Sequence, residues 1–189
     1  MKEALFSFVK QEMNQFVGHD FDHSVRVHRN AVRIAEDETC DMMVVEAAAI
    51  VHDYLDHKFG GDTKERQEKL AHVLSEVGLS SSQTELVLGI INTMSFTKGV
   101  LMTTMEGMIV QDADRLDALG AIGIARTFAY GGHLGRPLYG TDESSLQHFH
   151  DKLFKLKNLM NTSKGKVLAI ARHEFMLMYM EQLAQELRM

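Results

Sequence analysis

The sequence has little of what β-rich or secreted proteins need. Its 189 residues include one proline, one cysteine and no tryptophan. Sandwiches and barrels use proline and glycine freely in turns, so a single proline favours a few long helices. Cys40 stands alone and cannot form an intramolecular disulfide, which fits a reducing compartment. We therefore expect an all-α fold in a cytoplasmic protein.

Long hydrophobic runs and an excess of positive charge are also missing. Apolar stretches such as residues 47–51 and 167–171 are far shorter than the roughly 18 residues of a membrane span. Glu3 stands where a signal peptide needs a basic patch followed by an apolar run. The net charge of −6 disfavours nucleic acids and anionic membranes as partners, because both attract positive surfaces. We expect a soluble protein with a small-molecule substrate, and leave a homo-oligomer open.

What the sequence does contain is a globular composition with helical patterning. Hydrophobic residues make up 45% and charged residues 24%, which excludes a disordered chain. Neither a repeat nor a linker divides the chain, so we expect a single domain over residues 1–189. Asp62 with Glu65, and Ser82 with Glu85, are typical of capping boxes that open helices. The predicted helices span about residues 2–17, 22–35, 41–55, 62–77, 82–92, 108–130, 143–161 and 163–189. The helix over residues 108–130 is expected to bend near Gly120.

Ten histidines and 26 acids are the residues able to carry chemistry, and many of them gather in three clusters. A lone histidine near a helix end is more often a hydrogen-bonded core residue, and an aspartate after an apolar run is more often a cap. Burying such groups side by side is costly unless something compensates their charge. A mixed imidazole and carboxylate set of this kind suits a divalent metal ion. The set that the sequence offers is His23, His52, Asp53 and Asp112.

The segments around these four residues carry a family resemblance. They include Gly18-His19-Asp20-Phe21-Asp22-His23, Ala49-Ile50-Val51-His52-Asp53-Tyr54-Leu55-Asp56 and Gln111-Asp112-Ala113-Asp114-Arg115-Leu116-Asp117. With the loop at 131–140 and the segment at 152–165, they resemble the HD-domain metal-dependent phosphohydrolase superfamily, in its stand-alone bacterial type similar to nucleotide pyrophosphohydrolases. The resemblance implies an all-helical HD fold. It also implies one divalent metal ion (Mn²⁺, Co²⁺, Ni²⁺, Fe²⁺ or Mg²⁺) on His23, His52, Asp53 and Asp112.

Asp56 is the candidate general base. It lies four residues after His52 and three after Asp53, so it faces the same side of any continued helix. The resemblance implies that this acid activates the attacking water. The alternative is a solvent-facing acid at a helix end.

Cations from separate segments are candidates to bind phosphate groups. Arginine supplies bidentate contacts and lysine a point charge. Arg26 lies one turn after His23, and Lys58 follows the helix that carries His52 and Asp53; we assign both cations to catalysis. Further candidates for substrate binding are Arg115, Lys152, His133 and Arg136. The alternative for Arg26 and Arg115 is a structural ion pair with Asp22 or Asp117.

The sequence favours one metal ion over two. His57 and His72 are the extra histidines between the HD pair and Asp112, but neither has the surrounding residues of a second site. We therefore expect a phosphohydrolase that cleaves (deoxy)nucleoside triphosphates to monophosphate and pyrophosphate. The runner-up is a 5′-nucleotidase or another phosphomonoesterase. Two alternatives of other classes are a catalytically silent sensor of metal or nucleotide and a di-iron oxygenase.

Overall fold

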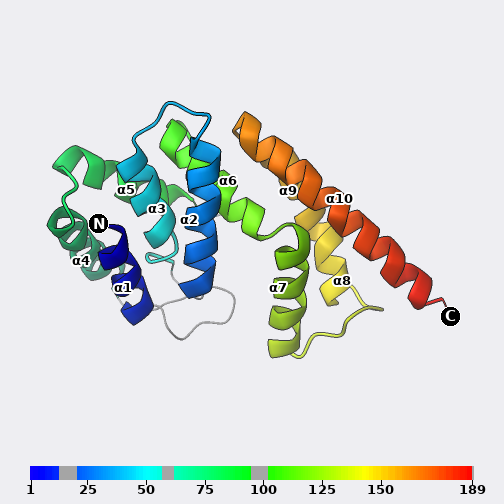
Figure 1. The fold of residues 1–189 in the computed structure, drawn as a ribbon. Coiled ribbons are helices and arrows are strands. Elements are labelled where there is room, and N and C mark those ends of the chain that lie inside the picture. The colour runs from blue at the N-terminus through cyan, green and yellow to red at the C-terminus, as the bar shows by residue number, and fades with distance from the viewer. Residues whose placement is uncertain (13–20, 57–61, 95–101, 189) are drawn as a thin grey trace. The chain divides into compact units, whose positions relative to one another are not determined.

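Helices account for the regular structure of the described residues, and no strand occurs among them (Figure 1). The computed structural model describes residues 1–12, 21–56, 62–94 and 102–188. This confirms the predicted all-α fold. The chain divides into two compact units, residues 1–114 and 115–189, with the boundary inside helix α6 (Met105–Asp117). The single domain expected over residues 1–189 stays a prediction.

The first unit is built around helix α3 (Met42–Val51), which contacts α1 (Lys2–Glu12), α2 (Phe21–Ala35) and α5 (Ser81–Thr93). All α3 residues from Val44 onward are buried except the half-buried Glu46, as expected of a core helix. Helix α4 (Thr63–Glu76) packs against α5. The core helix thus ends at the position where His52 and Asp53 follow.

Side-chain caps mark where three helices of the first unit begin. Asp41 caps α3, and its Oδ1 accepts a hydrogen bond from the Met43 N–H at 2.9 Å. Asp62 caps α4, as the sequence predicts, by accepting from the Lys64 N–H at 2.8 Å, whereas the sequence expected a capping box with Glu65. The capping box of α5 is formed by Ser80 and Gln83, two residues earlier than the expected pair of Ser82 and Glu85.

The second unit contains α7 (Gly120–His133) and the long α10 (Ser163–Glu186), which contact each other. Between them, α8 (Ser145–His148), a π-helix (Phe149–Leu153), α9 (Phe154–Leu156) and a 3-10 helix (Lys157–Leu159) follow without a break. The sequence predicted one regular helix for this stretch. It also predicted one bent helix over residues 108–130, where the structure has two helices. Gly120 begins α7 at φ +73°, a left-handed conformation that favours glycine.

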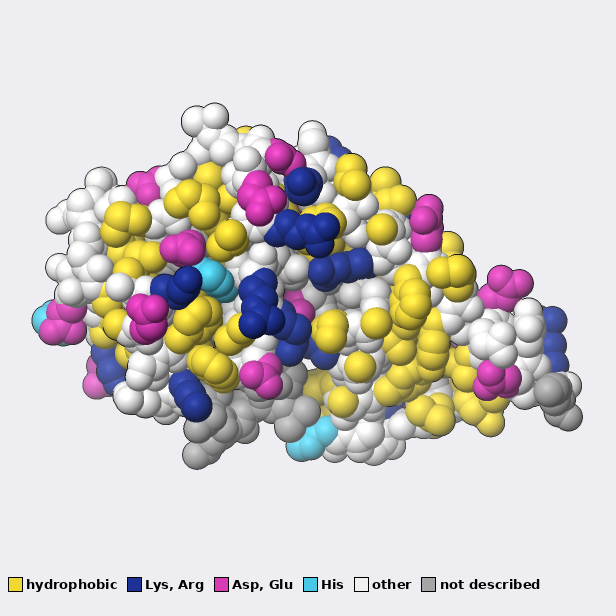
Figure 2. Space-filling model, viewed as in Figure 1, with side chains coloured by type: hydrophobic (Ala, Val, Ile, Leu, Met, Phe, Trp, Pro, Cys, Tyr) yellow, Lys and Arg dark blue, Asp and Glu magenta, His cyan; other side chains and the backbone are white. Residues whose placement is uncertain are grey.

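Helix α10 buries one face and exposes apolar side chains on the other. Ala169, His173 and Met176 are buried, whereas Val167 and Met178 are exposed. Hydrophobic and acidic side chains both appear along the visible side of α10 (Figure 2). Among the helices of the described ranges, none combines the length and the apolar character needed to cross a bilayer.

Candidate metal centre

Two buried histidines from different helices face each other in the first unit. His23 lies in the first turn of α2, and His52 is the C-cap residue of α3. Their Nε2 atoms are 3.1 Å apart, and each side chain is 1% exposed. The Nδ1 atom of His52 lies 3.0 Å from the Ala49 carbonyl oxygen, a hydrogen bond that needs the proton on Nδ1. In the neutral ring, Nε2 of His52 therefore carries a lone pair toward the centre.

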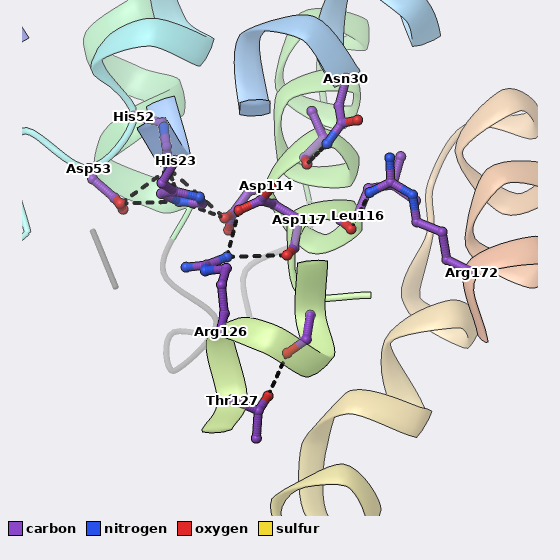
Figure 3. Close-up of polar contacts among 12 residues, drawn as sticks. His23, Asn30, His52, Asp53, Asp114, Leu116, Asp117, Arg126, Thr127 and Arg172 are labelled. Atoms are coloured by element: carbon purple, nitrogen blue, oxygen red, sulfur yellow. Dashed lines mark hydrogen bonds and ion pairs between the residues drawn. The ribbon is translucent and has the colours of Figure 1, made fainter. Parts of the chain in front are cut away.

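Two carboxylates complete the cluster around these nitrogen atoms (Figure 3). Oδ2 of Asp53 lies 3.4 Å from His23 Nε2 and 3.3 Å from His52 Nε2. Oδ1 of Asp114, from α6, lies 3.4 Å and 3.9 Å from the same two atoms. One ligand atom each of His23, His52 and Asp114 lies within 4.8 Å of the others. The cluster thus gathers two imidazoles and two carboxylates from α2, α6 and the end of α3.

The spacing and chemistry of these atoms fit one divalent metal ion. Ligand atoms bound at about 2.1 Å to a common ion lie about 3 Å apart when they are neighbours. The separations of 3.1 to 3.4 Å are close to this value, and the 3.9 Å separation is wider. A backbone carbonyl that holds the second ring nitrogen is the usual outer-shell partner of a metal-binding histidine. The donor set suits Mn²⁺, Co²⁺, Ni²⁺ or Fe²⁺ and does not choose among them.

The electrostatics of the cluster favour positive charge. Burial acts to lower the pKa of His52, but the negative charge of Asp53 and its hydrogen bond outweigh burial, and the pKa is raised. Burial acts to raise the pKa of Asp114, but the hydrogen bond from His23 and the charges of His52 and His23 hold that pKa below its usual value. The raised pKa of His52 favours its protonated form, and a metal ion would compete with that proton for the ring nitrogen.

The aspartate of α6 that lies near the two histidines is not the one that the sequence named. Asp114 is the α6 residue that the structure brings to the two histidines, and Asp112 is not part of that group. Asp112 is fully buried two residues earlier in the same helix. Residues two positions apart in an α-helix point in directions about 200° apart, so one helix face cannot present both. The geometry therefore supports Asp114 in the place where the sequence expected Asp112.

The structure describes two of the three candidate catalytic residues. Asp56 is half-buried and lies in the turns after α3, where its N–H donates to the Asp53 carbonyl at 2.9 Å. The helix expected to continue through residue 55 has ended by then. Arg26 is half-buried in α2, one turn after His23. Lys58 lies outside the described residues, as does His57. The catalytic roles of Asp56, Arg26 and Lys58 stay predictions.

The four candidate substrate-binding residues belong to the second unit. The Arg115 guanidinium donates to the Leu159 carbonyl. Lys152 is half-buried in the π-helix, and His133 is exposed at the end of α7. Arg136 lines a pocket together with Asp142, Glu143, Ser144, His148 and Asp151. Their roles in substrate binding also stay predictions.

Two further polar residues went unassigned in the sequence. Nη1 of Arg126 in α7 pairs with the buried Asp117 carboxylate at 2.7 Å. The sequence offered Arg115 as a partner for Asp117, and no spacing signal pointed to Arg126. Asn30 in α2 donates through Nδ2 to the Ala113 carbonyl at 3.2 Å. Its position seven residues after His23 was the available signal, because two helical turns place both on one face.

An all-helical unit that gathers a histidine, a His-Asp pair and a later aspartate defines the HD class of metal-dependent hydrolases. A family model described as HD domain matches residues 20–119 of the chain. The Bacillus subtilis protein YpgQ is 41% identical over 174 residues, covering 90% of this chain and 85% of YpgQ. The chain belongs to the HD-domain family.

Solved structures agree with this assignment. The crystal structure of Bacillus subtilis YpgQ in complex with ADP has a TM-score of 0.85 and 40% identity, covering 98% of this chain and 97% of YpgQ. An HD-superfamily hydrolase from Bacillus thuringiensis has a TM-score of 0.84 and 41% identity, covering 99% of this chain and 96% of that one. The protein is thus an HD-superfamily hydrolase.

Proposed function

We propose that this protein is a metal-dependent phosphohydrolase that converts (deoxy)nucleoside triphosphates to monophosphate and pyrophosphate. The observation that carries the proposal is the cluster of two buried histidines, His23 and His52, with the carboxylates of Asp53 and Asp114, whose spacing fits one divalent ion. The complex of YpgQ with ADP supports a nucleotide as the substrate class, because that relative is 40% identical. The lone Cys40 supports a cytoplasmic setting.

In this proposal each residue of the cluster has one task. His23, His52, Asp53 and Asp114 hold the ion, and the Ala49 carbonyl keeps the His52 ring in the binding tautomer. When bound, a divalent ion neutralises phosphate charge and lowers the pKa of a coordinated water toward neutrality. The residues of the chain then orient the substrate and move the proton.

The proposed reaction is a hydrolysis at the α-phosphorus. Asp56 accepts a proton from water as the water oxygen forms a bond to phosphorus. The bond from the α-phosphorus to the bridging oxygen of the β-phosphate breaks, and pyrophosphate leaves. Arg26 and Lys58 would neutralise the charge that develops on the reacting phosphate.

The choice of a triphosphate rests on the number of cations available. A monophosphatase needs to enclose one phosphoryl group, whereas a pyrophosphohydrolase must also hold two phosphates beyond it. Arg115, Lys152, His133 and Arg136 come from several segments and would serve those phosphates.

Product analysis of a triphosphate digest tests the proposal. The purified protein is incubated with each dNTP and Mn²⁺, and the products are separated by anion-exchange chromatography. We expect monophosphate and pyrophosphate in equal amounts, without diphosphate as an intermediate. Phosphate released from monophosphates, with triphosphates untouched, would instead identify a 5′-nucleotidase. Binding of nucleotide without any product would identify a sensor.

A further inference from the structure

Asn30 is a buried polar residue on the same face of α2 as His23. The two are seven residues apart, which is about two helical turns. Asn30 is 9% exposed, and the neighbouring positions Val27 and Ile34 are fully buried. A polar amide in such surroundings is costly unless it is hydrogen-bonded.

The Asn30 amide bonds to the backbone of α6 between Asp112 and Asp114. Its Nδ2 donates to the Ala113 carbonyl oxygen at 3.2 Å, and this bond is buried (Figure 3). Ala113 is itself fully buried and directly precedes Asp114. The Asn30 side chain therefore holds the α6 backbone directly before Asp114. The Asp114 carboxylate in turn lies 3.4 Å from His23 Nε2.

The hydrogen bond from Asn30 to Ala113 restricts how α6 can pack against α2. An apolar side chain of similar shape would occupy the position without the desolvation cost of an amide. A directional bond instead selects one rotation and one axial position of α6 against α2. A rotation of α6 by one residue, about 100°, would turn the Asp114 carboxylate away from the histidines.

We propose that Asn30 is a positioning residue that holds Asp114 in place as a metal ligand. The inference rests on the proposed metal centre. Asn30 does not touch the ion; it acts through the backbone of Ala113 and thereby sets where the Asp114 carboxylate lies.

Asn30→Leu tests the inference, because leucine keeps the branched shape and removes the amide. Binding of Mn²⁺ is measured by isothermal titration, coordination geometry by the visible spectrum with Co²⁺, and stability by urea unfolding of the metal-free protein. We expect metal affinity to fall about tenfold or more, as for other outer-shell partners. We also expect an altered Co²⁺ spectrum and an unfolding free energy that is unchanged or higher.

Thr84→Val is the matched control. Thr84 is a buried residue of α5, and its hydroxyl has no hydrogen-bond partner in the part of the chain that the structure describes. The control removes a buried hydroxyl and breaks no hydrogen bond to α2 or α6, so metal affinity should stay at the wild-type value. Asn30→Ala is the second variant, which serves if leucine prevents folding.

The outcomes separate this inference from the proposed function. A wild-type protein that binds no metal ion would overturn the metal centre and the inference with it. Wild-type binding together with unchanged affinity and spectrum in the folded Asn30 variants would overturn the role of Asn30 alone. A loss that Thr84→Val reproduces would also overturn it, because the effect would then be general destabilisation.

Discussion

Single side chains at the candidate metal centre differ in their contacts with the other members of the cluster. The Ala49 carbonyl fixes the proton of His52 on Nδ1, and this leaves Nε2 to face His23, Asp53 and Asp114. Asp53 lies within 3.4 Å of both histidine nitrogen atoms and is 14% exposed. Its carboxylate is therefore the one that approaches both rings most evenly.

Asp53→Ala should abolish metal binding and hydrolysis and leave the helical fold largely intact. The substitution removes one carboxylate from the cluster, and Asp53 lies after the end of the core helix α3. Metal content is measured by mass spectrometry of the protein after dialysis, and helicity by far-ultraviolet circular dichroism. Glu36→Ala, at an exposed acid beyond the end of α2, is the control and should keep its metal. An unaltered metal content in Asp53→Ala would contradict the assignment.

The choice between two aspartates of α6 shows what sequence spacing cannot decide. Asp112 and Asp114 are two residues apart, and both belong to the pattern that resembles the HD family. Which one meets the histidines depends on the rotation of α6 about its axis, and tertiary packing sets that rotation. The His-Asp pair at 52 and 53 was easier to predict, because it follows an apolar helix that must be buried.

Side chains that cap the backbone made some helix boundaries predictable from the sequence, although the capping box of α5 was expected two residues too late. The Asp62 cap of α4 was expected, whereas the π-helix at Phe149–Leu153 has no simple sequence signal. The break between α6 and α7 was seen only as a bend at glycine, because the close approach of Gly123 to Ala118 arises from the folded backbone.

Gly123→Ala should lower the free energy of unfolding by about 2–3 kcal/mol. A Cβ at this position would lie 2.3 Å from the Ala118 carbonyl oxygen, and a backbone atom cannot move aside as a flexible side chain does. Gly132→Ala in the same helix is the control, because a Cβ there meets nothing within 4 Å. The control should gain about 0.5 kcal/mol from helix propensity. Equal urea midpoints for both variants would contradict the expectation.

Asp41→Ala should destabilise the protein in a way that depends on pH. The hydrogen bond from Gln83 and those from the Val44 and Met43 N–H groups lower the pKa of Asp41 against the opposing effect of burial. A lowered pKa gives stability that is present above about pH 4, the unfolded value, and lost as pH falls through the folded value. We expect the variant to lose about 1 kcal/mol at pH 7 and less at pH 3. Urea unfolding at both pH values measures this, and an equal loss at both would contradict it.

At the scale of the molecule, histidines that are at least partly buried link stability to pH in the described residues. Burial lowers the pKa of His28, His148 and His173, and it is the largest effect on the pKa of each. The fold therefore keeps each of these histidines neutral at pH values where the unfolded chain would already bind the proton. Their contribution to stability is present above about pH 6.5 and is lost as pH falls toward the folded values.

His173→Leu should weaken the fall in stability between pH 7 and pH 5. His173 is buried in α10, Lys157 adds to the lowering of its pKa, and its Nδ1 has no hydrogen-bond partner in the described residues. Leucine cannot bind a proton in either state, so one source of the pH dependence disappears. Urea unfolding at several pH values compares the slopes. Identical slopes for the variant and the wild type would show that His173 stays out of this linkage.

The central claim is that His23, His52, Asp53 and Asp114 form a metal centre. Titration of the metal-free protein with Mn²⁺, followed by electron paramagnetic resonance, measures the number of ions bound per chain. We expect one ion for the wild type, one for Asp112→Asn and none for Asp114→Asn. A wild type that binds no Mn²⁺, or an Asp114→Asn variant that binds it as the wild type does, would contradict the account.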